Sequence, residues 1–435
     1  MFMNAFLQFL KYRTIFLLLN LFSIAQMLSQ QSKLIQLIHA DSLVGRKYDS
    51  KTVRELIGNV QLKHENIYVW CDRAIQYVDE NRIEAYGNLK VKQDTLLLEA
   101  DQGVYLGDKK IAICEGNVKL TDGRTSLEAK YGNYDTQKKL AIFKSNVKLV
   151  DSTTIITSDE LFYYRTDKKS IAVGNVAIKN LENNITIYGG YFENYDSAKY
   201  SVIKTNPKLV QIDTSSDGKV DTLIVIGKFM EAFRDTSVSM FSATDSVVIV
   251  RGDLSAVCGD VFYYDKKDLI ILWRNPIVWY ENSQISGDSI VVKLIDRKID
   301  EVFIYGSAFA IDPADSAYPE RFNQLKGKTM RIKFKENKID EVYVEKNAVS
   351  LYYIFETGET GEKKPNGVNH VSGDSVWIKF KDGKMQRIKI VGGIEGVYYP
   401  EELIAGKESS FNLEGFNYVK RKPKKNAKLE IVWAK

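Results

Sequence analysis

The chain has 435 residues, 44% of them hydrophobic and 27% charged, so it can hold two ordinary domains or one long repeat stack and is too apolar for a disordered protein. Its 61 basic and 56 acidic residues leave a net charge of only +5, spread along the sequence, which excludes the dense basic surface of a nucleic-acid-binding protein. Three cysteines, Cys71, Cys114 and Cys258, are too few for a disulfide framework, and we expect them to act as small buried side chains.

The N-terminus has the pattern of a secretory signal. Lys11 and Arg13 precede an apolar run from Ile15 to Ile24, and Ser23-Ile24-Ala25 offers a small-x-small cleavage site. We therefore assign residues 1–30 to a signal peptide and expect an exported protein. A retained membrane anchor is the alternative, which the shortness of the run disfavours.

A 29-residue repeat follows, centred on a small residue, an Asn and an apolar residue. Its five copies are Gly58-Asn59-Val60, Gly87-Asn88-Leu89, Gly116-Asn117-Val118, Ser145-Asn146-Val147 and Gly174-Asn175-Val176, and a weaker sixth is Thr205-Asn206-Pro207. A fixed period of this length predicts stacked units that bury their apolar faces against their neighbours.

Each copy alternates apolar and polar residues with period two, which predicts a strand with one apolar face. The Gly or Ser sits in the middle of that face, where a missing or small side chain permits a sharp bend. A second column, Asp72, Asp101, Lys130 and Asp159, marks the same bend in a partner strand, and turn signals such as Gly107-Asp108-Lys109 separate the two. The sequence therefore predicts, over residues 31–213, a meander of ten creased antiparallel strands that forms an open trough.

The second region, 214–435, repeats this pattern less regularly. It follows a polar boundary at 213–219, and Gly259-Asp260, Gly287-Asp288 and Gly373-Asp374 restart units. We expect loops at the trough's rim over 312–324 and 356–370. We expect the C-terminal tail, with six basic residues between Lys420 and Lys428, to be solvated rather than bound to an anionic membrane.

No residue pattern points to catalysis. The three histidines, His39, His64 and His370, lack metal-ligand spacing to one another or to a cysteine, and His64 falls in a predicted turn. The Asp column could bind Ca²⁺, but Lys130 interrupts it, so we interpret it as a row of polar corner residues. The sequence predicts no enzyme, no cofactor and no metal.

The Gly-Asn-Val units in an exported chain, together with Lys338-Ile339-Asp340-Glu341-Val342 and the following Asn347–Tyr353, resemble the OstA-like family of lipopolysaccharide-transport proteins. The resemblance covers about residues 33–400, and the later signature looks like that of the longer OstA-like proteins of Bacteroidota. It implies an all-β, elongated β-jellyroll whose interior holds the acyl chains of lipopolysaccharide in the periplasm, possible association with the inner or outer membrane, edge-strand pairing with other lipopolysaccharide-transport proteins, and head-to-tail homo-oligomers. The missing array of membrane-barrel strands disfavours the translocon itself.

The inward parity supplies the candidate lipid-binding residues. They are Leu56, Val60, Leu62, Ile83, Leu89, Val91, Val118, Leu120, Phe143, Val147, Leu149, Val176 and Ile178. The column Lys90, Lys119, Lys148 and Lys208 is expected on the solvated outer face. A β-solenoid scaffold or surface adhesin without a lumen is the alternative, and the hairpin turns argue against it.

Overall fold

The computed structural model describes residues 35–433 except 49–50, 65, 136, 183, 215–217, 219, 236–237, 297, 358–361 and 382–383. The predicted signal peptide lies outside the described residues. The chain divides into two compact units: an N-terminal unit up to Pro207 that also includes Glu231–Asp235, and a C-terminal unit formed by Lys208–Met230 and the residues from 236 onward. The domain limits at 30 and 213 stay predictions.

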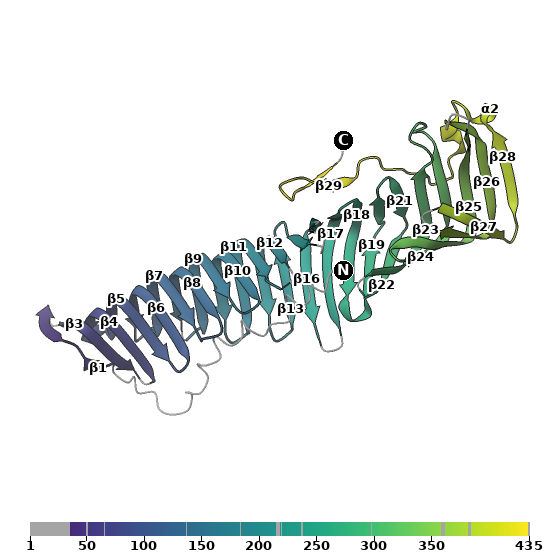
Figure 1. The fold of residues 1–435 in the computed structure, drawn as a ribbon. Helices are drawn as coiled ribbons and strands as arrows, with labels where there is room; N and C mark the ends of the chain where they lie inside the picture. Colours follow the sequence, from purple (N-terminus) through teal and green to yellow (C-terminus); the bar gives the residue numbers. More distant parts are fainter. Residues whose placement is uncertain are drawn as a thin grey trace. The chain divides into compact units, whose positions relative to one another are not determined.

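The N-terminal unit contains the ten long strands that the repeat predicts, in an antiparallel meander in which each strand pairs with the next (Figure 1). They are β3 (Lys51–His64), β4 (Ile67–Tyr77), β5 (Arg82–Gln93), β6 (Leu96–Leu106), β7 (Ile111–Thr121), β8 (Ser126–Asp135), β9 (Leu140–Val150), β10 (Thr154–Tyr164), β11 (Lys169–Asn180) and β12 (Ile185–Tyr195). The short strands β1 (Gln36–His39) and β2 (Ser42–Tyr48) both pair with β3, and β13 (Tyr200–Lys204) pairs with β12. A 3-10 turn, η3 (Val78–Glu80), links β4 to β5, and β16 (Phe229–Arg234) spans the change of unit.

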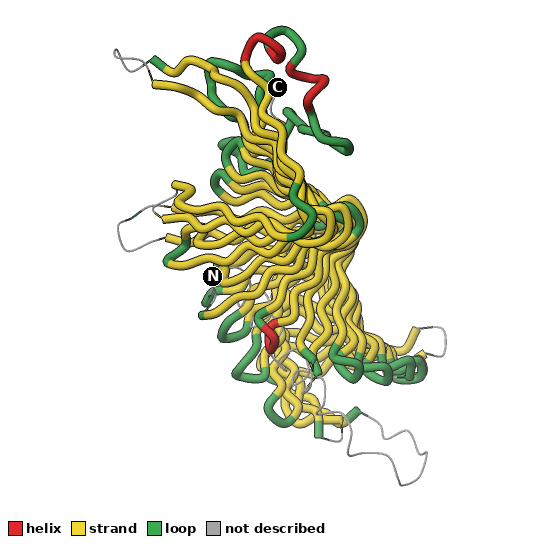
Figure 2. The backbone as a smooth tube through the Cα atoms, turned by 90° about the vertical axis from the view of Figure 1, so that its right-hand side faces the viewer, coloured by secondary structure: helices red, strands yellow, loops and turns green. Residues whose placement is uncertain are grey.

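Every Gly-Asn pair of the repeat is a crease in its strand (Figure 2). Gly116 has φ +73° and Asn117 has φ +44°, and the register between β7 and β8 shifts between Glu115 and Val118. The same left-handed pair and the same register shift recur at the other copies, with Ser145 at φ +65°. The predicted mid-strand bend is therefore confirmed, and residues on both sides of it keep one apolar face inside the fold.

The partner column closes each crease with a side-chain hydrogen bond. Asn88, Asn117 and Asn175 each donate from Nδ2 to the Asp sixteen residues earlier, at 2.9 to 3.0 Å from its Oδ2. Each of these carboxylates lies against the Cα of the neighbouring glycine, in the space that a Cβ would fill. The Asp column is thus a row of corner residues, as interpreted from the sequence.

Lys130 is the exception in the Asp column. At that crease Ser145 also replaces the usual Gly. At the sixth crease, Thr205-Asn206, Thr205 packs against Gly190 instead, so the small residue moves to the partner strand. The volume of the two facing residues is therefore the constraint, because only one of them can carry a bulky side chain at the crease.

We expect Gly116→Ala to lower the free energy of unfolding by roughly 2–4 kcal/mol. An L-residue at positive φ costs about 1–2 kcal/mol, and the added methyl group would also overlap the Asp101 carboxylate. Gly123→Ala is the matched control, because Gly123 also has positive φ (+89°) but open space around it. Denaturant unfolding of both variants separates strain from overlap. Equal losses would show that the carboxylate contact is unimportant.

The C-terminal unit is built from creased strands of the same kind. Its strands are β14 (Lys208–Thr214), β15 (Val220–Ile226), β17 (Ser239–Arg251), β18 (Leu254–Tyr264), β19 (Leu269–Trp273), β20 (Ile277–Tyr280), β21 (Ser283–Ser286), β22 (Ser289–Ile295), β23 (Lys298–Pro313), β24 (Phe322–Lys335), β25 (Lys338–Thr357), β26 (Lys363–Lys381), β27 (Lys384–Val391) and β28 (Glu395–Pro400). At several creases the strand is interrupted. One half of β18 therefore pairs with β19 and the other half with β20, and the two halves of β26 likewise pair with β27 and β28.

Of the two loops expected in this unit, one is wrong and the other is confirmed in part. Residues 356–370 are not a rim loop, because β25 and β26 extend through most of that range as a long hairpin. Of 312–324, only the part between Pro313 and Phe322 is a connection. The cause is a second cover: a further segment packs on one face of these arms, where Leu351, Tyr353 and Val368 are buried, while Tyr352 on the other face is 45% exposed.

The second cover comes from the C-terminal segment, which comprises α2 (Glu401–Ile404), the 3-10 turn η5 (Glu408–Phe411) and the hairpin β29 (Pro423–Lys425) and β30 (Ile431–Trp433). At the Gly306-Ser307 crease, Ile304 and Ala308 take the inward parity, so Phe309 and Ile311 face outward. These outward residues form a buried cluster with Phe322, Ile404 and Leu413. Figure 2 shows α2 and η5 outside the folded strands.

Candidate functional site

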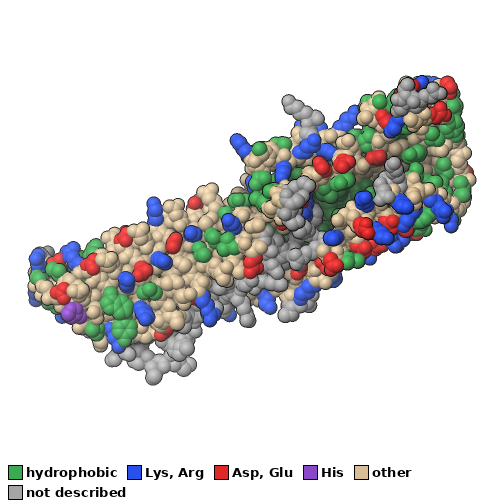
Figure 3. Space-filling view, viewed as in Figure 1, with side chains coloured by type: hydrophobic (Ala, Val, Ile, Leu, Met, Phe, Trp, Pro, Cys, Tyr) green, Lys and Arg blue, Asp and Glu red, His purple; other side chains and the backbone are tan. Residues whose placement is uncertain are grey.

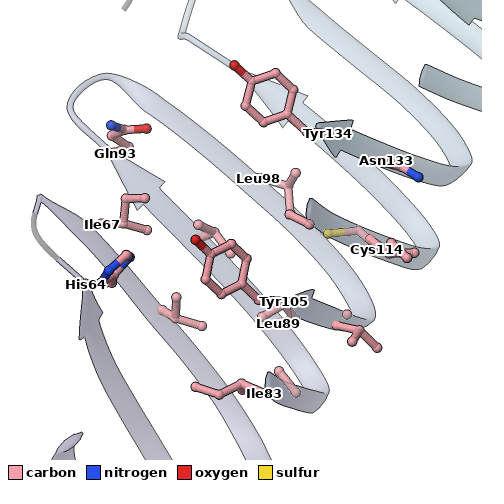
Figure 4. A pocket seen from close by; sticks show the side chains of 18 of the residues that line it. His64, Ile67, Ile83, Leu89, Gln93, Leu98, Tyr105, Cys114, Asn133 and Tyr134 are labelled. Carbon is pink, nitrogen blue, oxygen red and sulfur yellow. The ribbon is translucent and has the colours of Figure 1, made fainter. Parts of the chain in front are cut away.

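The inner face of the N-terminal unit encloses a cavity of about 230 Å³ that is partly open to solvent. Residues of β3 to β9 line it from successive strands, and Figure 4 shows Leu89, Leu98 and Tyr105 around a common space. Nearly all lining atoms are carbon, because period-two alternation sends each strand's apolar parity inward. Even the thiol of Cys114 remains neutral here, since burial raises its pKa to about 12.

Half of the predicted lining residues reach a cavity. Leu62, Ile83, Leu89, Val91, Leu120 and Phe143 line the large one. Leu149 lines a second space of only about 30 Å³, together with Leu120 and Phe143. Contact of these residues with lipid remains a prediction.

The other predicted residues are packed solid near the crease. Leu56, Val60, Val118, Val147, Val176 and Ile178 have exposed fractions of 2% or less and line neither cavity. Val176 and Ile178 belong to β11, outside the strands that line the large cavity. The other four lie in β3, β7 and β9 and are buried among their neighbours.

The partner strands also line the cavity, although the sequence prediction does not include them. The wall contains Val69 of β4, Leu98 and Tyr105 of β6, and Tyr134 of β8. Their signal was available, because Leu96, Leu98 and Ala100 alternate with period two just as Leu89 and Val91 do.

Polar side chains mark one end of the cavity. His64 at the end of β3 is half-buried, and its ring lies 6.1 Å from that of Tyr105. Gln93 donates from Nε2 to Asn66 Oδ1 at 3.2 Å, while its own Oε1 is buried without a hydrogen-bond partner among the described residues. The prediction of a turn at His64 is therefore wrong, because His64 is the last residue of β3 and belongs to the cavity wall.

The outer face carries the charge. Lys90, Lys119 and Lys148 are exposed as predicted, and Lys90 pairs with Glu99 at 3.0 Å. Figure 3 shows Lys, Arg, Asp and Glu side chains scattered over the face in view. Such a surface solvates the protein around an oily interior.

Within the described ranges, no group of three or more His, Cys, Asp or Glu side chains could hold a metal ion. The three described cysteines are free and buried, as expected. Over the same part of the chain, no helix has the length and apolar character to cross a bilayer.

The creased antiparallel β-jellyroll with an apolar cavity along its inner face places the N-terminal unit in a class of fold but not in a family. Comparison with known families identifies which one: the family described as "OstA-like protein" matches residues 32–188, and the family described as "LptA/(LptD N-terminal domain) LPS transport protein" matches residues 126–298. Residues 32–298 belong to the OstA-like family of lipopolysaccharide-transport proteins, which are transport rather than catalytic proteins. A search among curated proteins found no match.

Proposed function

We propose that this chain binds the acyl chains of lipopolysaccharide in the interior of its N-terminal unit and carries the lipid through the periplasm toward the outer membrane. The observation that carries the proposal is the apolar cavity formed by β3 to β9. Every methylene moved from water into such a space contributes about 0.8 kcal/mol. The sugars and phosphates stay in solvent.

The size of the cavity bears on how loading occurs. Its volume of about 230 Å³ is below the roughly 300–1,000 Å³ typical of small-ligand sites. A lipid with several acyl chains therefore requires the two arms of the sheet to separate. The creases provide the hinge, because each is a pair of left-handed residues in an otherwise extended strand.

An edge of the N-terminal unit fits the predicted pairing with transport partners. The residues of β1 and those of β2 up to Lys47 are exposed, among them Leu37, Ile38 and Leu43, at the strand edge opposite β3. Another sheet edge could add there by main-chain hydrogen bonds. Partners would be other lipopolysaccharide-transport proteins or a second copy joined head to tail. A filled scaffold or adhesin is the lesser candidate, because it has no use for an open apolar cavity.

Photo-crosslinking tests the carrier function. A photoreactive residue at Leu98, which faces the cavity, should give a lipopolysaccharide adduct in cells, whereas one at Glu99, the next residue on the outer face, should not. The same residue at Leu43 should give an adduct of protein size. Equal lipid adducts at Leu98 and Glu99 would refute the assignment of the cavity as the lipid path.

A further inference from the structure

The C-terminal segment is fixed to the C-terminal unit by a buried ion pair. The side chain of Arg321 is 4% exposed and donates to both oxygens of Glu401, at 2.8 and 2.6 Å, and to Glu408 at 3.2 Å. Ile404, between the two glutamates, is fully buried. The start of the segment is therefore anchored to the connection that precedes β24.

Two buried glutamines hold the next part of the segment. Gln324 donates to Asn412 Oδ1 at 2.6 Å and accepts from Leu413 N at 2.9 Å. Gln284 repeats the arrangement, donating to Asn417 O at 2.8 Å and accepting from Val419 N at 2.9 Å. Each amide thus replaces a missing strand partner for the segment's backbone, and a segment held this way has a defined path.

The path ends in the hairpin of β29 and β30, which packs against β17 and β18. Lys422 donates to Glu281 O just before the hairpin begins, and Trp279 Nε1 donates to Val419 O at 3.2 Å. Six basic residues lie between positions 420 and 428, and the side chains of Lys424, Lys425 and Lys428 are exposed. The hairpin is therefore a placed basic surface rather than a loose tail.

The charges of this surface are available to a ligand. Its one described carboxylate, Glu430, accepts from Asn426 at 2.8 Å, and no described carboxylate pairs with Lys424, Lys425 or Lys428. The neighbouring charge of Lys424 adds to burial in lowering the pKa of Lys422. Val432 and Trp433 are 43% and 47% exposed on the adjoining strand, and Figure 3 shows Lys and Arg side chains around this part of the chain.

We propose that the hairpin Pro423–Trp433 docks the C-terminal unit on an anionic lipid bilayer, with its lysines at the headgroup phosphates and Trp433 in the interfacial layer. Basic residues beside an exposed tryptophan match the charge and polarity of that layer. Because basic residues near an anionic surface act additively, three lysines are expected to account for well over a tenfold increase in affinity. The proposal is independent of lipid carriage in the N-terminal unit.

Vesicle co-sedimentation of the exported protein tests the docking surface. Binding is expected to vesicles that contain phosphatidylglycerol, to weaken with added salt, and to be absent with phosphatidylcholine alone. K424Q/K425Q/K428Q should weaken it at least tenfold, and W433S by a smaller factor. The control K109Q/K130Q/K199Q removes the same charge from exposed sites of the N-terminal unit and should bind as the unchanged protein does.

Each other outcome overturns the proposal. Equal losses in the two triple variants would show an effect of net charge alone, and absent binding would show that the hairpin is not a docking surface. Displacement by millimolar inorganic phosphate would indicate a site for single phosphates instead of a bilayer. Thermal unfolding of each variant confirms that the fold is retained, and binding of a dansyl-labelled fatty acid reports the N-terminal cavity separately.

Discussion

Replacing Ala112 by Trp should weaken binding of acyl chains by the N-terminal unit roughly a hundredfold. Ala112 lies on the inner face of β7 and lines the cavity between Tyr105 of β6 and Tyr134 of β8, its register partners. An indole at this position occupies the space that a chain would enter. Excluding only four methylenes, at about 0.8 kcal/mol each, weakens binding by about 3 kcal/mol, or roughly a hundredfold.

The measurement is titration of purified protein with lipopolysaccharide and, separately, with a dansyl-labelled fatty acid. Lys119→Trp places the same side chain on the exposed outer face of the same strand and should leave both affinities unchanged. Because overpacking can cost about 1–3 kcal/mol, the melting temperature of each variant accompanies the titration. Unaltered affinity in a folded Ala112→Trp protein would place lipid outside this cavity.

The architecture of the N-terminal unit was predictable because its constraints are local and repeated. The crease at Gly116-Asn117 needs a left-handed pair, and that need reappears in sequence every 29 residues. The same alternation predicts which side chains face the interior. Each of the predicted lining residues is buried or lines a cavity. A periodic pattern thus carries both the strand and the face that it buries.

Where the interior is open was not predictable from that pattern. Leu89 and Val118 hold the same position directly after a crease, yet only Leu89 lines a cavity, while Val118 is fully packed. The distance between the arms depends on side chains from strands far apart in sequence, such as Tyr105 and Phe143. No period in one strand encodes that distance.

The position of the C-terminal segment could not be predicted from the sequence either, since Arg321 and Glu401 are 80 residues apart and belong to no repeat. One local signal did exist. The apolar run Leu351–Phe355 has no polar break and predicts cover on both faces, although the structure covers Leu351 and Tyr353 and leaves Tyr352 45% exposed. That run indicates a second cover but does not identify the segment that provides it.

Arg321→Ala should release this segment and lower the free energy of unfolding of the C-terminal unit by roughly 3 kcal/mol. The change leaves two carboxylates facing each other, with side-chain exposures of 24% for Glu401 and 20% for Glu408, and removes the charge that binds them. Hydrogen exchange at Leu413 and Val419, whose backbone amides donate to the buried glutamines, should accelerate. Arg321→Lys should recover only part of the protection, because an ammonium group cannot bind Glu401 through two parallel hydrogen bonds.

Acid should have the same effect as the substitution. The pKa of Glu408 lies below its ordinary value. The largest cause is a backbone hydrogen bond to its carboxylate, and a hydrogen bond from the Arg321 side chain lowers the pKa further. The resulting stabilisation is complete above the pKa of the unfolded state and is lost as pH falls through the lowered native value. The protection of the Leu413 amide, measured as its exchange rate relative to that of an unfolded peptide at the same pH, should therefore fall in acid in the unchanged protein and depend less on pH in Arg321→Ala. Arg387→Ala, which removes an exposed guanidinium from β27, is the control and should shift neither quantity. If Arg321→Ala leaves exchange at Leu413 slow, the two glutamines and the apolar cluster suffice to hold the segment.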